Sequence, residues 1–549
     1  MMELFNLIPI HEAMRYGHWV LPTLDGLPRV KKPPLPVWIP GWLGVLFGTG
    51  SLWVLRLPSA LLGTLTCMAT YGLGVVASRD RRLGLFAAIA LAGMFVFTRQ
   101  ARLASYDIYC TAFTTVGFMA LLAMVEQPGR WWQWACAAGV ALGLAVLSKG
   151  PVNPLFVCIP FGCWMLVYHR TRRAWLGLLL ALLASIAVFL PWLLIVAQRY
   201  ADAGYGNAWA AWTRQFVRYS AAKGPQYTDT RWYYFGMLGW VAPWTPALVA
   251  ALALPFLPAQ SKPLPTEQEK RTRWLFWLVL LLGLLLLTLP HQKKQRYALQ
   301  QFPAAALLAA AVWQEFCRLR RSVKIEPAAG VLLAAQSLMM AGAGALLLAF
   351  IGMMLGAHLP PYALHPGKLS FWQAMAQLKP AYQALGLFGW LGIALALIAV
   401  GLLLWRTQWQ RRFAASFMLY SLGTWLLVGS TTWAYRSEAY QTSVYKQPTR
   451  AMLALAGHHK IYTFIQDRPW LPVQYYANKI LPPVYAPQLR AIVSRARGPV
   501  YVLTRKNPVF QRKLAAICRQ THRKSAAIFH LYDGHKQQYL YRLTAVKKQ

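Results

Sequence analysis

An aspartate stands where a long apolar stretch begins, in the segment ARLASYDIYCTAF at residues 101–113. Arg102 precedes it closely, and after Asp107 no charge appears until Glu126. Carboxylates are scarce in this chain, which has 15 Asp and Glu against 56 Lys and Arg. A carboxylate at a helix start can simply cap free backbone N–H groups. Because ionisable groups at membrane depth are functional candidates, Asp107 is also a candidate catalytic residue.

Cations gather in four other short segments that contain prolines, glycines or aromatic residues. They are Lys31 and Lys32 in RVKKPPLPVW (29–38), Lys149 in LSKGP (147–151), Lys293, Lys294 and Arg296 in HQKKQRYALQQFP (291–303), and Arg214, Arg218 and Lys223 in the loop 212–235. Lys and Arg side chains pair with phosphate, and aromatic residues near the headgroups can support a lipid tail. We therefore predict a site for an anionic lipid headgroup with a carboxylate beside it.

The composition predicts the elements that must position these residues. The chain has 549 residues, of which 57% are hydrophobic and only 13% charged, and its mean hydropathy is +0.37. Soluble domains carry about a quarter charged residues, so an integral membrane protein is expected. Apolar runs close to the ~20 residues that cross a bilayer predict an all-α polytopic domain of about twelve spans. These spans are 53–77, 83–97, 108–125, 132–147, 153–168, 174–197, 232–257, 274–290, 298–316, 328–355, 384–405 and 413–434.

Short basic clusters between the apolar runs predict the orientation. The net charge of +41 could suggest a nucleic-acid partner. However, the basic residues form short clusters between apolar runs, as they do in the cytoplasmic loops of membrane proteins, and this argues against a nucleic-acid-binding protein. The clusters are Arg79, Arg81 and Arg82; Arg170, Arg172 and Arg173; Lys270, Arg271 and Arg273; Arg318, Arg320, Arg321 and Lys324; and Arg406, Arg411 and Arg412. Residues 1–50, 98–107, 148–152, 198–231, 291–297, 356–383 and those after 435 are then outside. Cations in the outer segments run against the orientation rule, which favours a binding role for them.

The last part of the chain differs from the rest in pattern. Residues 1–435 form the predicted transmembrane domain, and 436–549 a small extracytoplasmic α/β domain. Strands are expected at 460–465, 499–503, 527–532 and 539–543, with helices at 473–479, 488–496 and 511–520 between them. Its basic surface is either an ordinary solvated face or a contact with anionic lipid headgroups.

Sequence motifs for metal binding, nucleotide binding and internal repetition are missing from the sequence. The seven cysteines form no CxxC pair or metal spacing, and they are expected to be buried free thiols. No nucleotide-binding glycine loop is present. No internal repeat is visible either, which counts against a transporter.

The quoted segments resemble a known family in their order. GHWVLPTLDGLPRVKKPPLPVW (17–38), RLASYD (102–107), LSKGP (147–151), FLPWLL (189–194), RWYYF with PW (231–244) and KKQRYALQQFP (293–303) look like the GT-C glycosyltransferases. Within these, the chain is similar to the bacterial aminoarabinose transferases and the protein O-mannosyltransferase-like enzymes. The resemblance covers roughly residues 10–310. It implies an enzyme of the bacterial inner membrane, with its active site facing the periplasm. Its donor would be a sugar linked to a polyprenyl phosphate and its acceptor lipid A, another glycan or a protein.

The resemblance also implies roles for individual residues. By position, Asp107 matches an acidic residue of the second outer loop, and Lys32 matches the lysine of a KPP motif that holds the carrier phosphate. Lys293 and Tyr297 match a Lys–Tyr pair before the next span, and Arg218 matches an arginine of the long loop. Supporting roles are assigned to Lys31, Arg102 and Lys149.

Two positions depart from the family pattern. The aspartate of its Asp-Glu pair in the first loop falls at Met2, which leaves Glu3 as a second catalytic candidate. We expect that either the short N-terminus is translocated unaided or an upstream span with the acidic residue precedes the chain. Lys31 occupies the position of a metal-binding glutamate, so a divalent cation and aminoarabinose as the sugar are both in question.

The implied reaction is direct transfer. A carboxylate deprotonates the acceptor hydroxyl, which attacks the anomeric carbon, and cations stabilise the departing lipid phosphate. No nucleotide or redox cofactor is required. The alternatives are a lipid-linked substrate transporter or flippase, which needs the cations but no acid beside them, and a non-catalytic envelope assembly protein in which Asp107 only caps its helix.

Overall fold

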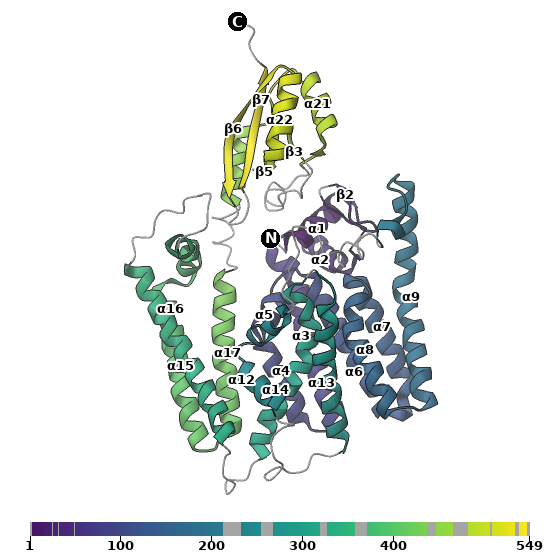
Figure 1. Cartoon of the computed structure of the whole chain (residues 1–549), viewed down its shortest axis with the longest axis vertical. Coiled ribbons are helices and arrows are strands. Elements are labelled where there is room, and N and C mark those ends of the chain that lie inside the picture. The colour runs from purple at the N-terminus through teal and green to yellow at the C-terminus, as the bar shows by residue number, and fades with distance from the viewer. Residues whose placement is uncertain are drawn as a thin grey trace.

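The structure, a computed structural model, describes residues 3–545 except 25, 31, 49, 212, 214–231, 254–266, 292, 319–326, 357–370, 436–445, 465–480, 506–507 and 533–536. Long helices run roughly along the longest axis, and a small sheet domain lies at one end of them (Figure 1). The helices are α1 (Leu4–Tyr16), α2 (Leu35–Leu46), α3 (Leu52–Ser78), α4 (Arg81–Ala92), α5 (Phe95–Ala101), α6 (Tyr106–Glu126), α7 (Trp131–Lys149), α8 (Val152–Tyr168), α9 (Arg172–Asp202), α11 (Met237–Trp240), α12 (Thr245–Ala253), α13 (Glu267–Thr288), α14 (Phe302–Arg318), α15 (Pro327–Gly356), α16 (Phe371–Trp409) and α17 (Phe413–Tyr435), with 3₁₀ helices η1 (Pro128–Arg130), η2 (Tyr233–Gly236) and η4 (Gln295–Gln301).

The predicted polytopic helical domain is confirmed, but the number of twelve spans is not. Among the described residues, eight helices are long and apolar enough to cross a membrane, or nine if the bent pair α4 and α5 counts as one span. Three other predicted spans fall on shorter helices: α8 and α14 have 17 residues each, and α12 has nine. Apolar composition alone did not distinguish these shorter helices from full spans.

Large apolar side chains are exposed on the long helices. Leu179, Leu182 and Leu183 of α9 are 52 to 57% exposed, and Leu346 of α15 is 74% exposed. Continuous exposed apolar surface of this kind is costly in water and favourable in lipid. The helices therefore belong to a multi-pass membrane protein.

The bend between α4 and α5 lies where a segment distant in the sequence packs closely against the chain. The two helices meet at 73°, with Gly93 and Met94 between them. A Cβ at Gly93 would lie 2.7 Å from the ring nitrogen of Trp244, so only glycine allows this close approach. The backbone N–H of Phe95 donates to the carbonyl of Ala242 at 2.9 Å. A backbone group freed by the bend is thus satisfied by another segment, as a membrane interior requires.

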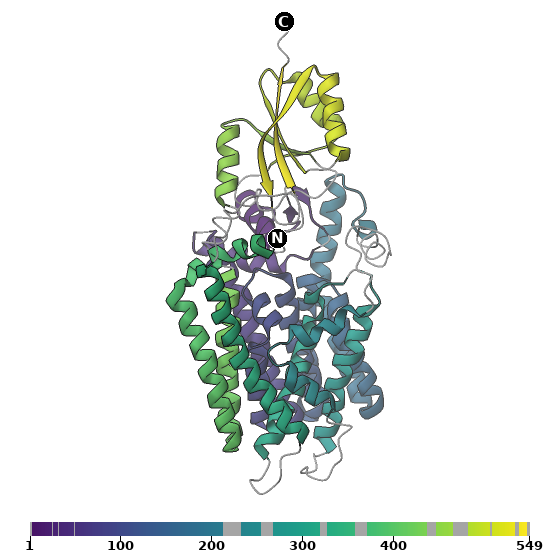
Figure 2. The ribbon, with the colours of Figure 1, turned by 60° about the vertical axis from the view of Figure 1, so that its left-hand side comes forward.

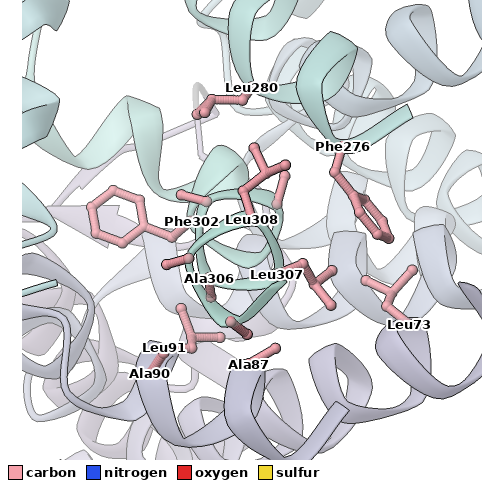
Figure 3. Close-up of a cluster of buried hydrophobic side chains, with 14 of the residues drawn as sticks. Leu73, Ala87, Ala90, Leu91, Phe276, Leu280, Phe302, Ala306, Leu307 and Leu308 are labelled. Atoms are coloured by element: carbon pink, nitrogen blue, oxygen red, sulfur yellow. The ribbon is translucent and has the colours of Figure 1, made fainter. Parts of the chain in front are cut away.

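The core of the bundle surrounds the alanine-rich helix α14. Ala306, Leu307 and Leu308 are at most 2% exposed. Figure 3 shows them between side chains of α4, such as Ala87 and Leu91, and of α13. Small residues let the neighbouring helices approach closely.

Two helices of the first 50 residues were not predicted, because that region was interpreted as an outer loop. α1 and α2 lie between the helical bundle and the sheet domain (Figure 1). Their apolar sides enclose Leu7, Ile10 and Val37, all buried. The rings of Trp19 and Trp42 stack at 5.4 Å. Both helices are too short to span a bilayer, so a search for apolar runs of about 20 residues does not select them, although α2 is apolar.

The C-terminal region contains a five-stranded mixed sheet with strand order β4-β3-β5-β7-β6 (Figure 2). Its elements are α19 (Gln447–Ala456), β3 (Ile461–Phe464), β4 (Pro483–Val484), α21 (Ala486–Arg495), β5 (Val500–Arg505), α22 (Pro508–Gln520), β6 (Arg523–Tyr532) and β7 (Gln537–Ala545). β3 is parallel to β4 and β5, whereas β7 pairs antiparallel with β5 and β6. The four predicted strands and two of the three predicted helices are confirmed. The third helix, at 473–479, lies outside the described residues.

Candidate active site

Asp107 lies in the first turn of α6 and is 6% exposed. Ser105 caps the helix, because its hydroxyl oxygen accepts a hydrogen bond from the Asp107 N–H at 3.2 Å. The Ser105 hydroxyl is itself the donor toward two oxygens. Gln100 Oε1 accepts at 2.9 Å and Asp107 Oδ2 at 3.3 Å. The cap belongs to Ser105, so the carboxylate of Asp107 is available for side-chain partners.

Lys149 provides the first of these partners. It ends α7, and its Nζ lies 2.5 Å from Asp107 Oδ1. The ammonium also donates to Asn153 Oδ1 at 2.9 Å and lies 4.5 Å from the centroid of the Tyr297 ring. Both side chains of the ion pair are at least nine-tenths buried. Lys149, predicted only as a supporting residue, thus contacts Asp107 directly.

Arg296 provides the second partner. Its Nε lies 3.2 Å from Asp107 Oδ2, and its guanidinium lies 5.7 Å from the Tyr297 ring centroid. Both residues belong to η4, the 3₁₀ helix that leads into α14, and Arg99 of α5 holds this helix through a 3.1 Å hydrogen bond to Gln295. Arg296 stands in a predicted basic segment but is not among the predicted site residues. Its position one residue before Tyr297 was the available signal.

Lys32 lies in the segment between β2 (Leu27–Pro28) and α2, where Pro34 stands at the N-cap and Pro36 in the first turn. Burial, followed by the charge of Lys149, lowers the pKa of the Lys32 ammonium to about 7. Arg29 and Arg296 lower this pKa further, whereas Asp107 raises it. Because the charges of these residues act on its pKa, Lys32 belongs to the same electrostatic cluster as Asp107. Among the residues that the structure describes, Lys32 has no carboxylate within ion-pair distance.

Arg29 fixes the Lys32 segment against the start of α6. Its guanidinium donates to the Tyr106 hydroxyl at 2.9 Å and to the carbonyl of Phe5. It also lies over the rings of both residues, 5.3 Å from the centroid of Tyr106. Lys149 and Arg296 pair with Asp107, and Lys32 and Arg29 add two further cations that act on one another. We call these five residues the cationic cluster.

Glu3 contacts the loop before Asp107, and its carboxylate already has hydrogen-bond partners. Its two carboxylate oxygens face Arg56 Nε and Nη2 at 2.6 and 2.7 Å, and Oε1 accepts the Ala104 N–H at 2.9 Å. The carboxylate is 6% exposed and supports the loop that precedes Asp107. Its predicted role as a base stays a prediction, and the geometry favours a positioning role.

Of the remaining predicted site residues, Arg102 and Lys293 make no ion pair with Asp107 in the described structure. Arg102 donates to the carbonyl of Gly429 at 2.8 Å and to Thr432 at 2.7 Å, so it connects the end of α5 to α17. Lys293 is 8% exposed and, within the described residues, makes no ion pair. Lys31 and Arg218 lie outside the described residues. Their proposed roles stay predictions.

The cluster does not suit a divalent cation. The described parts of the chain contain no group of three or more His, Cys, Asp and Glu residues that could hold one. Around Asp107 the neighbouring groups are ammonium and guanidinium ions, which repel a metal ion. We derive no step through a metal.

Comparisons with known proteins agree with this architecture. Residues 14–204 match the family described as dolichyl-phosphate-mannose-protein mannosyltransferase. The undecaprenyl phosphate-alpha-4-amino-4-deoxy-L-arabinose arabinosyl transferase of Pseudomonas aeruginosa is 29% identical over 255 residues, 44% of this chain and 44% of that protein. An arabinosyl transferase of the same description from Sodalis glossinidius is 26% identical over 61% of this chain and 59% of its own length. The two matches therefore cover 44% and 59% of the relatives' own lengths, which is less than two thirds.

Solved structures show a likeness over the whole chain. ArnT from Cupriavidus metallidurans in the apo state has a TM-score of 0.70 at 16% identity, covering 99% of this chain and 93% of that one. The same protein bound to undecaprenyl phosphate gives a TM-score of 0.69 at 16% identity, covering 98% and 93%. The resemblance predicted from the sequence is confirmed, and the fold is the GT-C type that ArnT has.

Proposed function

We propose that this protein is a glycosyltransferase that moves a sugar from a polyprenyl phosphate carrier to an acceptor. The observation that carries the proposal is the cationic cluster, in which four cations accompany one buried carboxylate and Lys32 has no described anionic partner. Unpaired buried charge costs several kcal/mol, roughly, so an anion that joins the cluster would stabilise it. A phosphate at the membrane surface fits this requirement. The relatives are arabinosyl transferases whose names include undecaprenyl phosphate, which supports the same assignment.

The reaction follows from the charges. The acceptor hydroxyl oxygen attacks the anomeric carbon while the bond from that carbon to the phosphate oxygen breaks. The bonding electrons stay with the phosphate, which leaves as the free lipid phosphate. Lys32, Lys149 and Arg296 stabilise its growing negative charge. Lys293 and Arg218 are further candidates for the same role.

The proton of the acceptor goes to a carboxylate. Without substrate, Asp107 is held by Lys149 and Arg296, and a doubly paired carboxylate is a weak base. A donor phosphate would compete with Asp107 for these cations and so release its carboxylate near the reacting centre. In this proposal Asp107 positions the cations first and accepts the proton second. Glu3, bound to Arg56, is the second candidate.

The location is proposed from the charge pattern. The basic clusters at the opposite ends of the helices favour a cytoplasmic position for those ends, and hence a bacterial inner membrane with the cationic cluster on its periplasmic face. The acceptor is a glycolipid such as lipid A, another glycan or a protein. The lipid-linked donor enters from the membrane.

Mass spectrometry of envelope lipids, glycans and proteins from a deletion strain tests the proposal. We expect one envelope molecule to lose a sugar mass and its polyprenyl phosphate donor to accumulate. Complementation with the intact gene should reverse both changes, whereas complementation with Lys32→Ala should not. Unchanged envelope glycans together with an unchanged donor pool would contradict the proposal.

A further inference from the structure

A cavity of about 420 Å³ lies at the end of α6 opposite Asp107. Its walls come from the last turn of α6, from η1, from the start of α7 and from the connection between α8 and α9. Met124 and Val125 line it from α6, so its distance from Asp107 along this helix is about 27 Å at ~1.5 Å per residue. The cavity is therefore separate from the cationic cluster.

Two arginines with no described carboxylate partner line this cavity. Arg172 and Arg173 are exposed and, in the described parts of the chain, make no ion pair. They occupy the first turn of α9, after the cap Thr171, whose hydroxyl accepts the Ala174 N–H at 3.3 Å. The positive end of the helix dipole disfavours cations there. Their position therefore opposes helix stability and favours an anion beside them.

The other walls suit the remainder of a lipid molecule. Trp131 lines the cavity, and tryptophan prefers the headgroup level of a membrane. Met124, Val125 and Ala174 form apolar wall. Beyond them on α9, exposed apolar side chains such as Leu176 and Leu179 provide a surface for acyl chains.

His169 completes the polar side of the cavity. Its Nε2 lies 3.8 Å from Glu126, beyond hydrogen-bond distance, and its ring lies 4.7 Å from that of Trp164. Burial and the charge of Arg271 lower the pKa of His169. The histidine is therefore largely neutral and can donate or accept one hydrogen bond at the cavity wall.

From this geometry we infer that the cavity binds the phosphate headgroup of an anionic phospholipid in the membrane leaflet opposite the cationic cluster. Arg172 and Arg173 contact the phosphate, and the apolar wall carries the first part of the acyl chains. Basic pockets between transmembrane helices bind anionic headgroups by this chemistry. The site is independent of the proposed sugar transfer.

Native mass spectrometry of the full-length protein in detergent tests the inference, with phosphatidylglycerol and phosphatidylcholine as the probes. We expect the wild type to retain phosphatidylglycerol preferentially. The double variant Arg172→Gln/Arg173→Gln should bind it about 25-fold more weakly, given roughly fivefold for each cation near a headgroup. Arg130→Gln/Arg170→Gln is the matched control, because it removes two exposed cations from the same membrane end outside the cavity. This control should stay within about twofold of the wild type.

A second variant separates the cavity from general surface charge. Val125→Trp fills the cavity without changing any charge and should also weaken phosphatidylglycerol binding. Equal losses in the two double variants, or full binding by Val125→Trp, would overturn the inference. Inorganic phosphate should not displace the lipid. Displacement at comparable concentration would overturn the lipid assignment in favour of a free phosphate site.

Discussion

The Lys149 ammonium lies 2.5 Å from Asp107 Oδ1, although the two residues end and begin different helices. Both side chains are buried, so neither charge is well solvated. Removing one partner leaves the other as an uncompensated buried charge. Loss of this ion pair should therefore affect both the stability of the bundle and the chemistry proposed for the site.

Asp107→Ala should lower the free energy of unfolding by about 3 kcal/mol, because Lys149 is left buried without its partner. The double variant Asp107→Ala/Lys149→Met should recover part of this loss. Thermal unfolding in detergent measures both. Glu267→Ala is the control, since its pair with Lys270 is exposed to solvent and its loss should change stability little. Additive losses in the double variant would mean that the two charges are not coupled.

Anion binding should depend on pH through Lys32, whose pKa is about 7 in the ligand-free protein. A polyprenyl phosphodiester carries one charge that does not titrate near neutrality. Below pH 7 Lys32 is already protonated and affinity should be constant. Above pH 7 a proton must be taken up, and affinity should fall about tenfold per pH unit until the pKa of the complex is reached.

Lys32→Arg provides the control for this titration. An arginine stays protonated, so its affinity profile should be flat between pH 6 and about 9. The same shift predicts that the ligand-free wild type gains stability as pH rises above 7, because the unfolded chain then binds more protons. A wild-type affinity that is unchanged across this range would contradict the assignment of Lys32 to the phosphate.

Tyr297 should act through its ring, which lies 4.5 Å below the Lys149 ammonium. Tyr297→Phe keeps the ring face and should retain most donor affinity. Tyr297→Leu removes the ring and should raise the KM for the donor about five- to thirtyfold, corresponding to 1–2 kcal/mol of cation–π energy. Steady-state transfer kinetics distinguish the two variants. Equal defects would assign the role to the hydroxyl.

Glu3 is tested by comparison with its partner. If Glu3 positions the loop through Arg56, Glu3→Gln and Arg56→Gln should lower the melting temperature and kcat together, and the double variant should be little worse than either. The expected loss is about 2–4 kcal/mol for each single variant. A Glu3→Gln protein with unchanged melting temperature and no turnover would instead identify Glu3 as the base.

Local patterns predicted the helices and strands better than they predicted the site. The apolar runs and the alternating C-terminal segments reflect burial and lipid exposure along single elements, which the sequence displays directly. The contact of Lys149 and Arg296 with Asp107 depends on how α6, α7 and η4 pack, and no local pattern encodes that. Asp107 itself could be selected because an isolated acid beside an apolar run is unusual. The bend at Gly93 was missed for a related reason: Trp244, which packs closely against Gly93, is distant in the sequence.

The central claim is that the protein transfers the sugar away from the lipid phosphate. The most direct test is to label these two parts of the donor separately and follow where each label goes. Donor that accumulates in a deletion strain can be labelled with ³²P in its phosphate and ¹⁴C in its sugar, then incubated with the purified protein and membranes of that strain. The account predicts that ³²P remains in the polyprenyl phosphate while ¹⁴C moves to an envelope acceptor, and that Lys32→Ala abolishes this separation. Labels that stay together while the wild-type protein carries intact donor across the membrane would contradict the account and identify a transporter.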